Sequence, residues 1–284
     1  MIRIIITLNL VEVKLRLFIT QLSEERGFEN WINLHRNTKY RRHEGIDWTA
    51  TFFILNNNEK QNETSPLATN IKAHKIKLLL EELPTIEHMK KRRPDLYNNW
   101  TCPTCNNHQE TFTHIWSCPK NQSKMAHIML NSRKKLITLI KKNTTHAFGY
   151  HDLDHVSIWS LENHETKLTF IDIIKGIVPK FLVDQINKVV NDVLMTHKII
   201  YAFIDKIYKD IMKYIWYPRC EVMMLLEKNS NINNRIKRAK CTTNRNKPLT
   251  IPRSTNIENI HRGWKGAIFS LNYGDTWLNY YNRS

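Results

Sequence analysis

The sequence has little glycine and lacks the residue patterns through which most nucleotide-handling enzymes work. Only seven of its 284 residues are glycine, and none belongs to a glycine-rich phosphate-binding loop. No two aspartates are adjacent, so the paired carboxylates that hold the two metal ions of a polymerase are missing. Asp152 and Asp154 are the one close pair of aspartates, and they lie in a polar stretch without strand periodicity. We therefore assign no catalytic residues and expect a protein that is not an enzyme.

Long uninterrupted apolar runs are also missing. The N-terminal stretch 1–18 is apolar, but the charged residues Arg3, Glu12, Lys14 and Arg16 interrupt it, which is too much charge for a membrane span. It also lacks the compact apolar block and small-residue cleavage site of a secretory signal. We therefore predict an intracellular protein, cytoplasmic or nuclear, with no membrane partner.

Acidic residues are scarce relative to basic ones. The chain has 43 Lys and Arg against 26 Asp and Glu, which gives a formal net charge of +17 and a pI of about 9.7. Lysines and arginines that replace counterions on phosphates favour a polyanionic partner, so RNA or DNA is the expected ligand. A basic surface kept for solubility is the alternative, and charge by itself indicates no chemistry.

The apolar periodicity predicts a mostly α fold. Residues 10–17 alternate between apolar and charged side chains, which indicates a short N-terminal strand. Helical spacing starts after Asn70, a candidate N-cap, and stops at Pro84; Thr85 can cap a second short helix that ends before Pro94. A further helix is expected around residues 125–140.

Two long amphipathic helices are predicted in the second half, over 168–195 and 197–228, with a bend at Pro218. Their apolar stripe is typical of a buried core, and it comprises Ile200, Phe203, Ile204, Ile207, Tyr208, Ile211 and Ile215. Residues 229–250 are rich in Asn, Lys and Arg and predict a flexible basic linker. The tail beyond it contains Trp264, Ile268 and Trp277, which are expected to dock back on the body.

These patterns divide the chain into five segments. They are an N-terminal segment of unassigned fold (1–64), a zinc-binding helical module (65–145), a helical body (146–228), the basic linker (229–250) and a short C-terminal element that contains tryptophan (251–284).

Three of the five cysteines lie within seventeen positions, beside a histidine at ligand spacing. Cys102 and Cys105 form a CxxC turn, and His114 and Cys118 follow at i and i+4, which brings both to one side of a helix. A Cys₃His set matches a closed tetrahedral zinc site without an open position for a catalytic water, so we predict one structural Zn²⁺. His108 is a competing ligand, but its short spacing from Cys105 favours His114. Buried free cysteines beside a packed histidine are the alternative.

A basic helix precedes this site directly. Once zinc orders the segment, that helix and two tryptophans are expected to contact phosphates and to stack on bases. The predicted nucleic-acid-binding residues are Lys90, Lys91, Arg92, Arg93, Trp100 and Trp116. Trp116 lies between two predicted ligands, and for this residue burial in the core is as well supported by the sequence as stacking on bases.

The motif set CPTC, Glu110-Thr111 and HIWSC resembles the reverse transcriptase zinc-binding domain near the C-terminus of non-LTR (LINE-type) retrotransposon polyproteins. The sequence directly before this motif set, LLLEELPTIEHMKKRRPDLYNNW, is similar to the fungal type of this family. The resemblance covers about residues 65–120 and implies the ligand set above, an RNA or DNA ligand, and a partner reverse transcriptase domain in a longer polyprotein. This chain carries neither polymerase nor RNase H motifs, so a non-catalytic remnant or C-terminal portion is expected.

Two other functions stay open at this point. In a protein–protein adaptor the zinc module would brace a helical scaffold, and the stripe of residues 200–215 would carry the partner surface. A metal-dependent nuclease would use Asp152 and Asp154.

Overall fold

The computed structural model describes residues 4–6, 9–11, 23, 26–41, 45–56, 65–144, 148–149, 151–153, 157–162 and 167–239. The chain divides into two compact units, one made of Met1–Arg42 with Arg245–Ser284 and the other of His43–Asn244. Among the described residues, no helix has the length and apolar character needed to cross a membrane.

The first unit contains the strands β1 (Ile4–Ile6) and β2 (Asn9–Val11), which pair antiparallel with Ile4 opposite Val11. Residues 26–32 are helical and lead to the 3₁₀ helix η1 (His35–Arg41). There the ring of Trp31 stacks on Tyr40 at a centroid distance of 5.9 Å. Of the strand predicted over 10–17, residues 12–17 lie outside the described residues.

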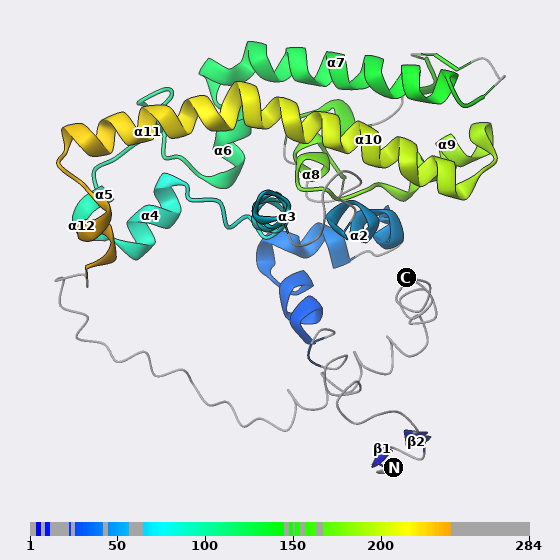
Figure 1. Cartoon of the computed structure of the whole chain (residues 1–284), viewed down its shortest axis with the longest axis horizontal. Coiled ribbons are helices and arrows are strands. Elements are labelled where there is room, and N and C mark those ends of the chain that lie inside the picture. The colour runs from blue at the N-terminus through cyan, green and yellow to red at the C-terminus, as the bar shows by residue number, and fades with distance from the viewer. Residues whose placement is uncertain are drawn as a thin grey trace. The chain divides into compact units, whose positions relative to one another are not determined.

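The second unit is built from helices, as the apolar periodicity predicts, so the protein is mostly α (Figure 1). In chain order they are α2 (Trp48–Asn56), α3 (Pro66–Leu79), α4 (Ile86–Arg92), α5 (Pro94–Tyr97), α6 (Phe112–Ser117), η3 (Pro119–Asn121), α7 (Gln122–Lys141), η4 (His151–Leu153), η5 (Ser157–Trp159), α8 (Phe170–Ile174), α9 (Lys180–Val190), α10 (Val193–Ile211), the π-helical turn η6 (Met212–Trp216), α11 (Tyr217–Asn229) and α12 (Asn234–Arg238).

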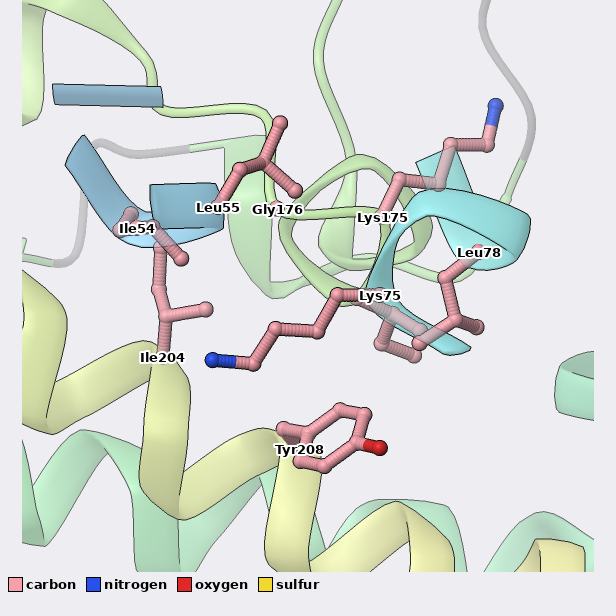
Figure 2. A pocket seen from close by; sticks show the side chains of 9 residues that line it. Ile54, Leu55, Lys75, Leu78, Lys175, Gly176, Ile204 and Tyr208 are labelled. Carbon is pink, nitrogen blue, oxygen red and sulfur yellow. The ribbon is translucent and has the colours of Figure 1, made fainter. Parts of the chain in front are cut away.

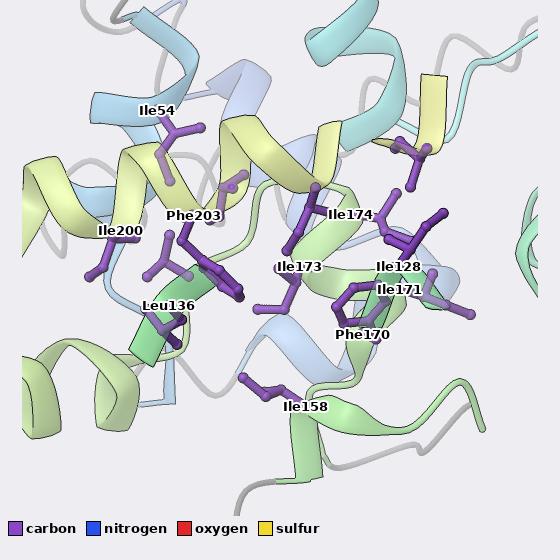
Figure 3. Packing of buried hydrophobic residues seen from close by; sticks show 14 of the residues in the cluster. Ile54, Ile128, Leu136, Ile158, Phe170, Ile171, Ile173, Ile174, Ile200 and Phe203 are labelled. Atoms are coloured by element: carbon purple, nitrogen blue, oxygen red, sulfur yellow. The ribbon is translucent and has the colours of Figure 1, made fainter. Parts of the chain in front are cut away.

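Helix α10 lies at the centre of this unit and packs against α2, α7, α8 and α9. Figure 3 shows Ile200 and Phe203 of α10 in one apolar cluster with Leu136 of α7 and Ile173 of α8. The cluster also contains Trp116 of α6, so the segment with the predicted metal ligands and the helical body share one core. The stripe over 200–215 is therefore core, as its spacing predicts, and it is not the free partner surface that the adaptor hypothesis requires.

Several helix boundaries differ from the sequence prediction. Helix α3 begins at Pro66 after Ser65, four residues before the predicted cap at Asn70, because proline at the first turn sacrifices no intrahelical hydrogen bond. Thr85 caps α4 as predicted, and its Oγ1 accepts a hydrogen bond from the His88 N–H at 3.2 Å.

The predicted helix over 168–195 is wrong as a single element. Gly176, at φ +88°, and Pro179 separate α8 from α9, and Asn191, at φ +54°, ends α9 before Asp192 caps α10. Residues with positive φ cannot continue a right-handed helix. Where a bend at Pro218 is predicted, the structure has the π-helical turn η6 directly before α11, since proline donates no backbone hydrogen bond to the preceding turn.

The linker predicted over 229–250 contains a helix. Asn233 caps α12, and its Oδ1 accepts a hydrogen bond from the Ile236 N–H at 3.0 Å. Lys237 of this helix forms an ion pair with Glu227 of α11, so the described part of this segment is ordered by contacts. Residues 240–250 and the tail with Trp264, Ile268 and Trp277 lie outside the described residues.

A buried lysine interrupts the apolar surroundings of α3. Lys75 is 6% exposed, and its Nζ lies 5.5 Å and 5.6 Å from the ring centroids of Tyr201 and Tyr208. Figure 2 shows its amine in a small pocket lined mainly by aliphatic side chains such as Ile54 and Ile204. The cavity is about 10 Å³, which is room for about one water molecule and no substrate. Burial lowers the pKa of Lys75, against the opposing charge of Asp205.

Replacing Lys75 with methionine is expected to raise the free energy of unfolding by about 1 kcal/mol at neutral pH, because a thioether packs on the tyrosines without a desolvated charge. The pKa of Lys75 is 10.5 in the unfolded chain and lower in the folded chain. Between these two pKa values the unfolded chain binds more protons than the folded chain, so the stability of the wild-type protein rises with pH. The Lys75→Met variant should lack this rise. Urea unfolding at neutral and alkaline pH measures both effects, with Lys77→Met on the exposed side of α3 as the matched control. A less stable Lys75→Met protein would contradict the expectation.

Candidate metal centre

The turn that carries Cys102 and Cys105 is closed by backbone hydrogen bonds. The Asn106 N–H donates to the Cys102 carbonyl, and the Cys102 N–H donates to the His108 carbonyl, both at 2.8 Å. Asn106 has a φ of +59°, in the left-handed region that asparagine tolerates better than most residues. The chain thereby doubles back and presents both thiols on one side.

The other two ligands are positioned by the short helix α6. The Thr111 Oγ1 caps this helix and accepts a hydrogen bond from the His114 N–H at 3.1 Å. Cys118 is the first residue beyond the helix, which differs from the prediction that both ligands lie within it. The i, i+4 spacing still brings the two side chains to the same side.

The four side chains meet in one cluster. The ligand atoms of Cys102, Cys105, His114 and Cys118 all lie within 4.8 Å of one another, and the Cys105 Sγ is 3.4 Å from the His114 Nε2. A tetrahedral zinc with Zn–S and Zn–N bonds of about 2.3 and 2.05 Å places sulfur and nitrogen about 3.6 Å apart and two sulfurs about 3.8 Å apart. The donor set and spacing are therefore compatible with one metal ion bound by all four side chains. The predicted cluster is confirmed as a group that can hold a metal.

His108 lies beside the cluster and is exposed. Its Nδ1 is 3.8 Å from the Cys105 Sγ, and its ring centroid is 5.4 Å from that of His114. The more buried His114 is the member of the four-residue cluster, which agrees with the choice made from spacing.

The three thiols have different environments. Burial raises the pKa of Cys102 to about 12 and also raises the pKa of Cys118. Burial acts in the same direction on Cys105, but hydrogen bonds from the Asn107 backbone and from the histidines outweigh it and lower its pKa to about 5. Since a metal takes thiolates, its binding displaces protons from the two buried cysteines.

A buried ion pair supports the metal-binding segment from behind. The Glu110 Oε1 accepts a hydrogen bond from the Ile86 N–H at 3.0 Å, and its Oε2 accepts one from the Arg219 Nε at 3.2 Å. The Glu110 carbonyl accepts from the Glu87 N–H at 3.1 Å. In the Glu110-Thr111 pair, therefore, the first residue joins α4 and α11 to this segment and the second caps α6.

Sequence reasoning did not single out Arg219, although a signal was present. Arg219 lies between Trp216 and Met223 in the sequence, and all three side chains are on the buried side of their helical segment. A charged residue at a core position needs a buried partner, and in this chain that partner is Glu110.

The basic helix α4 is partly neutralised by its own neighbours. The Lys91 Nζ lies 2.8 Å from the Glu87 Oε1. Arg93 pairs with Asp95, and it also donates hydrogen bonds to the Ile236 carbonyl and, at 3.1 Å, to the Ala239 carbonyl. The nucleic-acid-binding role predicted for Arg93 therefore conflicts with its contacts, which fasten α12 to α4. Arg92 is exposed and Lys90 is half-buried.

The two tryptophans have different positions. Trp116 is completely buried and packs edge-on against Phe112 at a centroid distance of 5.9 Å. Its predicted stacking on bases is wrong, because the residue has no exposed surface and belongs to the apolar core. Trp100 is half-buried and contacts Tyr97 edge-on at 5.2 Å.

The structure describes one of the two aspartates on which the nuclease hypothesis depends. The Asp152 Oδ2 accepts a hydrogen bond from the Gly149 N–H at 2.7 Å, which is a local turn contact. Asp154 lies outside the described residues.

Comparison of the chain with protein-family models, curated proteins and solved structures returns no match. The interpretation of the site therefore depends on its own chemistry.

Proposed function

We propose that this chain is a non-catalytic, zinc-stabilised protein that binds RNA or DNA with little sequence preference. The observation that carries the proposal is the closed Cys₃His cluster, whose four ligands leave no position for a reacting group. Such a cluster orders the surface around it, and in a chain of net charge +17 that surface is suited to polyphosphates.

Zinc is the proposed metal because three thiolates and one imidazole at these separations match its preferred tetrahedral site. The proposal includes the origin suggested by the resemblance, a remnant or C-terminal portion of a retrotransposon polyprotein that functions beside a reverse transcriptase. The chain would then work in the cytoplasm or the nucleus, where thiols stay reduced.

Burial of the 200–215 stripe favours nucleic-acid binding over the adaptor hypothesis. Six of its seven side chains are at most 4% exposed, so a partner protein could reach them only after the core opens. The remaining member, Tyr208, packs edge-on against His74.

Fluorescence anisotropy with a labelled nucleic acid of mixed sequence tests the proposal on the full zinc-loaded chain. Neutralising about six phosphates should lower the affinity about 1,000-fold between about 50 and 200 mM salt, with similar slopes for unrelated sequences. Chelation of the zinc should abolish the binding, because the ligand turn loses its ordered form. Undetectable binding at low salt would refute nucleic-acid binding, and equal binding after chelation would refute its dependence on zinc.

A further inference from the structure

Helix α7 begins directly after the metal cluster and contains no acidic residue. The whole stretch from residue 111 to residue 151 is free of Asp and Glu, although the chain has 26 of them. The 20 residues of α7 extend about 30 Å. Figure 1 shows this helix at an edge of its unit, with α10 beside it.

One side of α7 is buried and the other carries lysine. The buried side includes Met125, Ile128, Leu136 and Ile140, which belong to the core. The outer side, here called the α7 lysine face, consists of the exposed residues Lys124, Lys134, Lys135 and Lys141 together with Lys142, the residue that directly follows the helix. At 100° per residue these five lie within about 120° of one another and span about 27 Å along the axis.

The α7 lysine face is unneutralised in the part of the chain that the structure describes. None of its five lysines forms a salt bridge with a described residue, whereas Lys91, Lys206 and Lys209 each pair with a carboxylate one turn away. Five like charges on one helix face repel one another, so a polyanion that binds them relieves an unfavourable interaction.

We propose that the α7 lysine face binds the phosphate backbone of a nucleic-acid duplex, an inference that depends on the proposed function. The helix carries no Phe, Tyr or Trp, and its one imidazole, His127, lies 2.8 Å from the Asn131 Nδ2, whereas proteins that hold single strands combine cations with several rings on which bases stack. A duplex keeps its bases stacked internally and presents a regular row of phosphates. A straight row of lysines about 27 Å long matches that row without base contacts.

The metal cluster fixes the start of this face. The Asn121 N–H donates to the Cys118 carbonyl at 2.8 Å, and the Asn121 Nδ2 donates to the Ile115 carbonyl at 3.1 Å. Asn121, the residue directly before α7, is therefore held by one hydrogen bond to the ligand residue Cys118 and by another to the ligand helix α6. Loss of the metal releases this anchor, which explains why the binding should depend on zinc.

Three variants of the full zinc-loaded chain test the proposal, each with three positive charges removed. The α7 variant is Lys134→Gln, Lys135→Gln and Lys142→Gln. The control is Lys198→Gln, Lys213→Gln and Lys228→Gln, which removes exposed lysines of α10, η6 and α11. The α4 variant is Lys90→Gln, Lys91→Gln and Arg92→Gln. Thermal unfolding and zinc content confirm that each variant is folded.

The probe is a mixed-sequence DNA duplex of about 20 base pairs, compared with one of its single strands and with vesicles of anionic phospholipid. The α7 variant should bind the duplex about 100-fold more weakly at about 0.1 M salt, and the slope of log affinity against log salt should decrease by about 3. The control should change the affinity less than about threefold.

Each other outcome has a separate meaning. If wild-type chain binds nucleic acid and the α7 variant binds equally well, or only the α4 variant is weakened, the α7 proposal is overturned while the proposed function stands. Stronger binding to the single strand or to the vesicles than to the duplex overturns it as well. If the wild-type chain binds no nucleic acid at low salt, both proposals fail.

Discussion

Replacing Cys118 with serine is expected to eliminate bound zinc and to unfold the metal-binding segment. The wild-type chain should contain one zinc, and the variant close to none, because a serine hydroxyl is a poor substitute for a thiolate ligand. A structural zinc contributes about 10 kcal/mol of apparent binding free energy at neutral pH, so even partial loss should cost several kcal/mol. Elemental analysis of the purified chain measures the metal, and thermal unfolding measures the loss of stability.

The chain offers a matched control in Cys220, a half-buried free cysteine of α11 outside the cluster. Cys220→Ser should retain the zinc and most of the stability. The two histidines provide a second comparison, in which His114→Ala should lose the metal and His108→Ala should keep it. A wild-type chain without metal would refute the zinc assignment. Loss of zinc in His108→Ala but not in His114→Ala would show that His108, and not His114, is the histidine ligand.

Breaking the buried ion pair between Glu110 and Arg219 is expected to have the next largest effect. Their side chains are 1% and 4% exposed, so Arg219→Met leaves a carboxylate in the core with only the Ile86 N–H as a donor. A buried charge without its partner costs about 3–5 kcal/mol. Urea unfolding measures the loss. Zinc affinity should also fall, because Glu110 precedes the residue that caps the ligand helix.

An exposed ion pair supplies the contrast for this measurement. Lys91→Met removes the partner of Glu87, but Lys91 is 66% exposed, so the cost should stay below about 1 kcal/mol. The double variant Glu110→Gln, Arg219→Met should be more stable than the sum of its single changes predicts, by about 2 kcal/mol or more. If Arg219→Met costs no more than Lys91→Met, the ion pair does not hold the segment together.

The interactions that could be predicted from sequence are those between residues close in the chain. The CxxC turn brings two thiols together by itself, and the i, i+4 spacing does the same for His114 and Cys118. The Thr85 cap and the helix over 125–140 likewise depend on neighbouring residues, and the structure contains both. Helix boundaries in the second half could not be predicted from apolar spacing, because positive φ at Gly176 and Asn191 ends helices that this spacing alone would continue.

The sequence by itself determined the ligand set, the mostly α fold and the excess of positive charge, because ligand spacing, apolar periodicity and composition are local properties. Only the tertiary structure decided which charged and aromatic side chains remain accessible. Burial depends on the distant helix that covers a side chain: the shared core encloses Trp116, α12 accepts the hydrogen bonds of Arg93, and α11 supplies Arg219 to Glu110. The basic surface available to a partner is therefore α7 more than α4, because Lys91 of α4 and the adjoining Arg93 each have a carboxylate partner, whereas the α7 lysine face has none among the described residues.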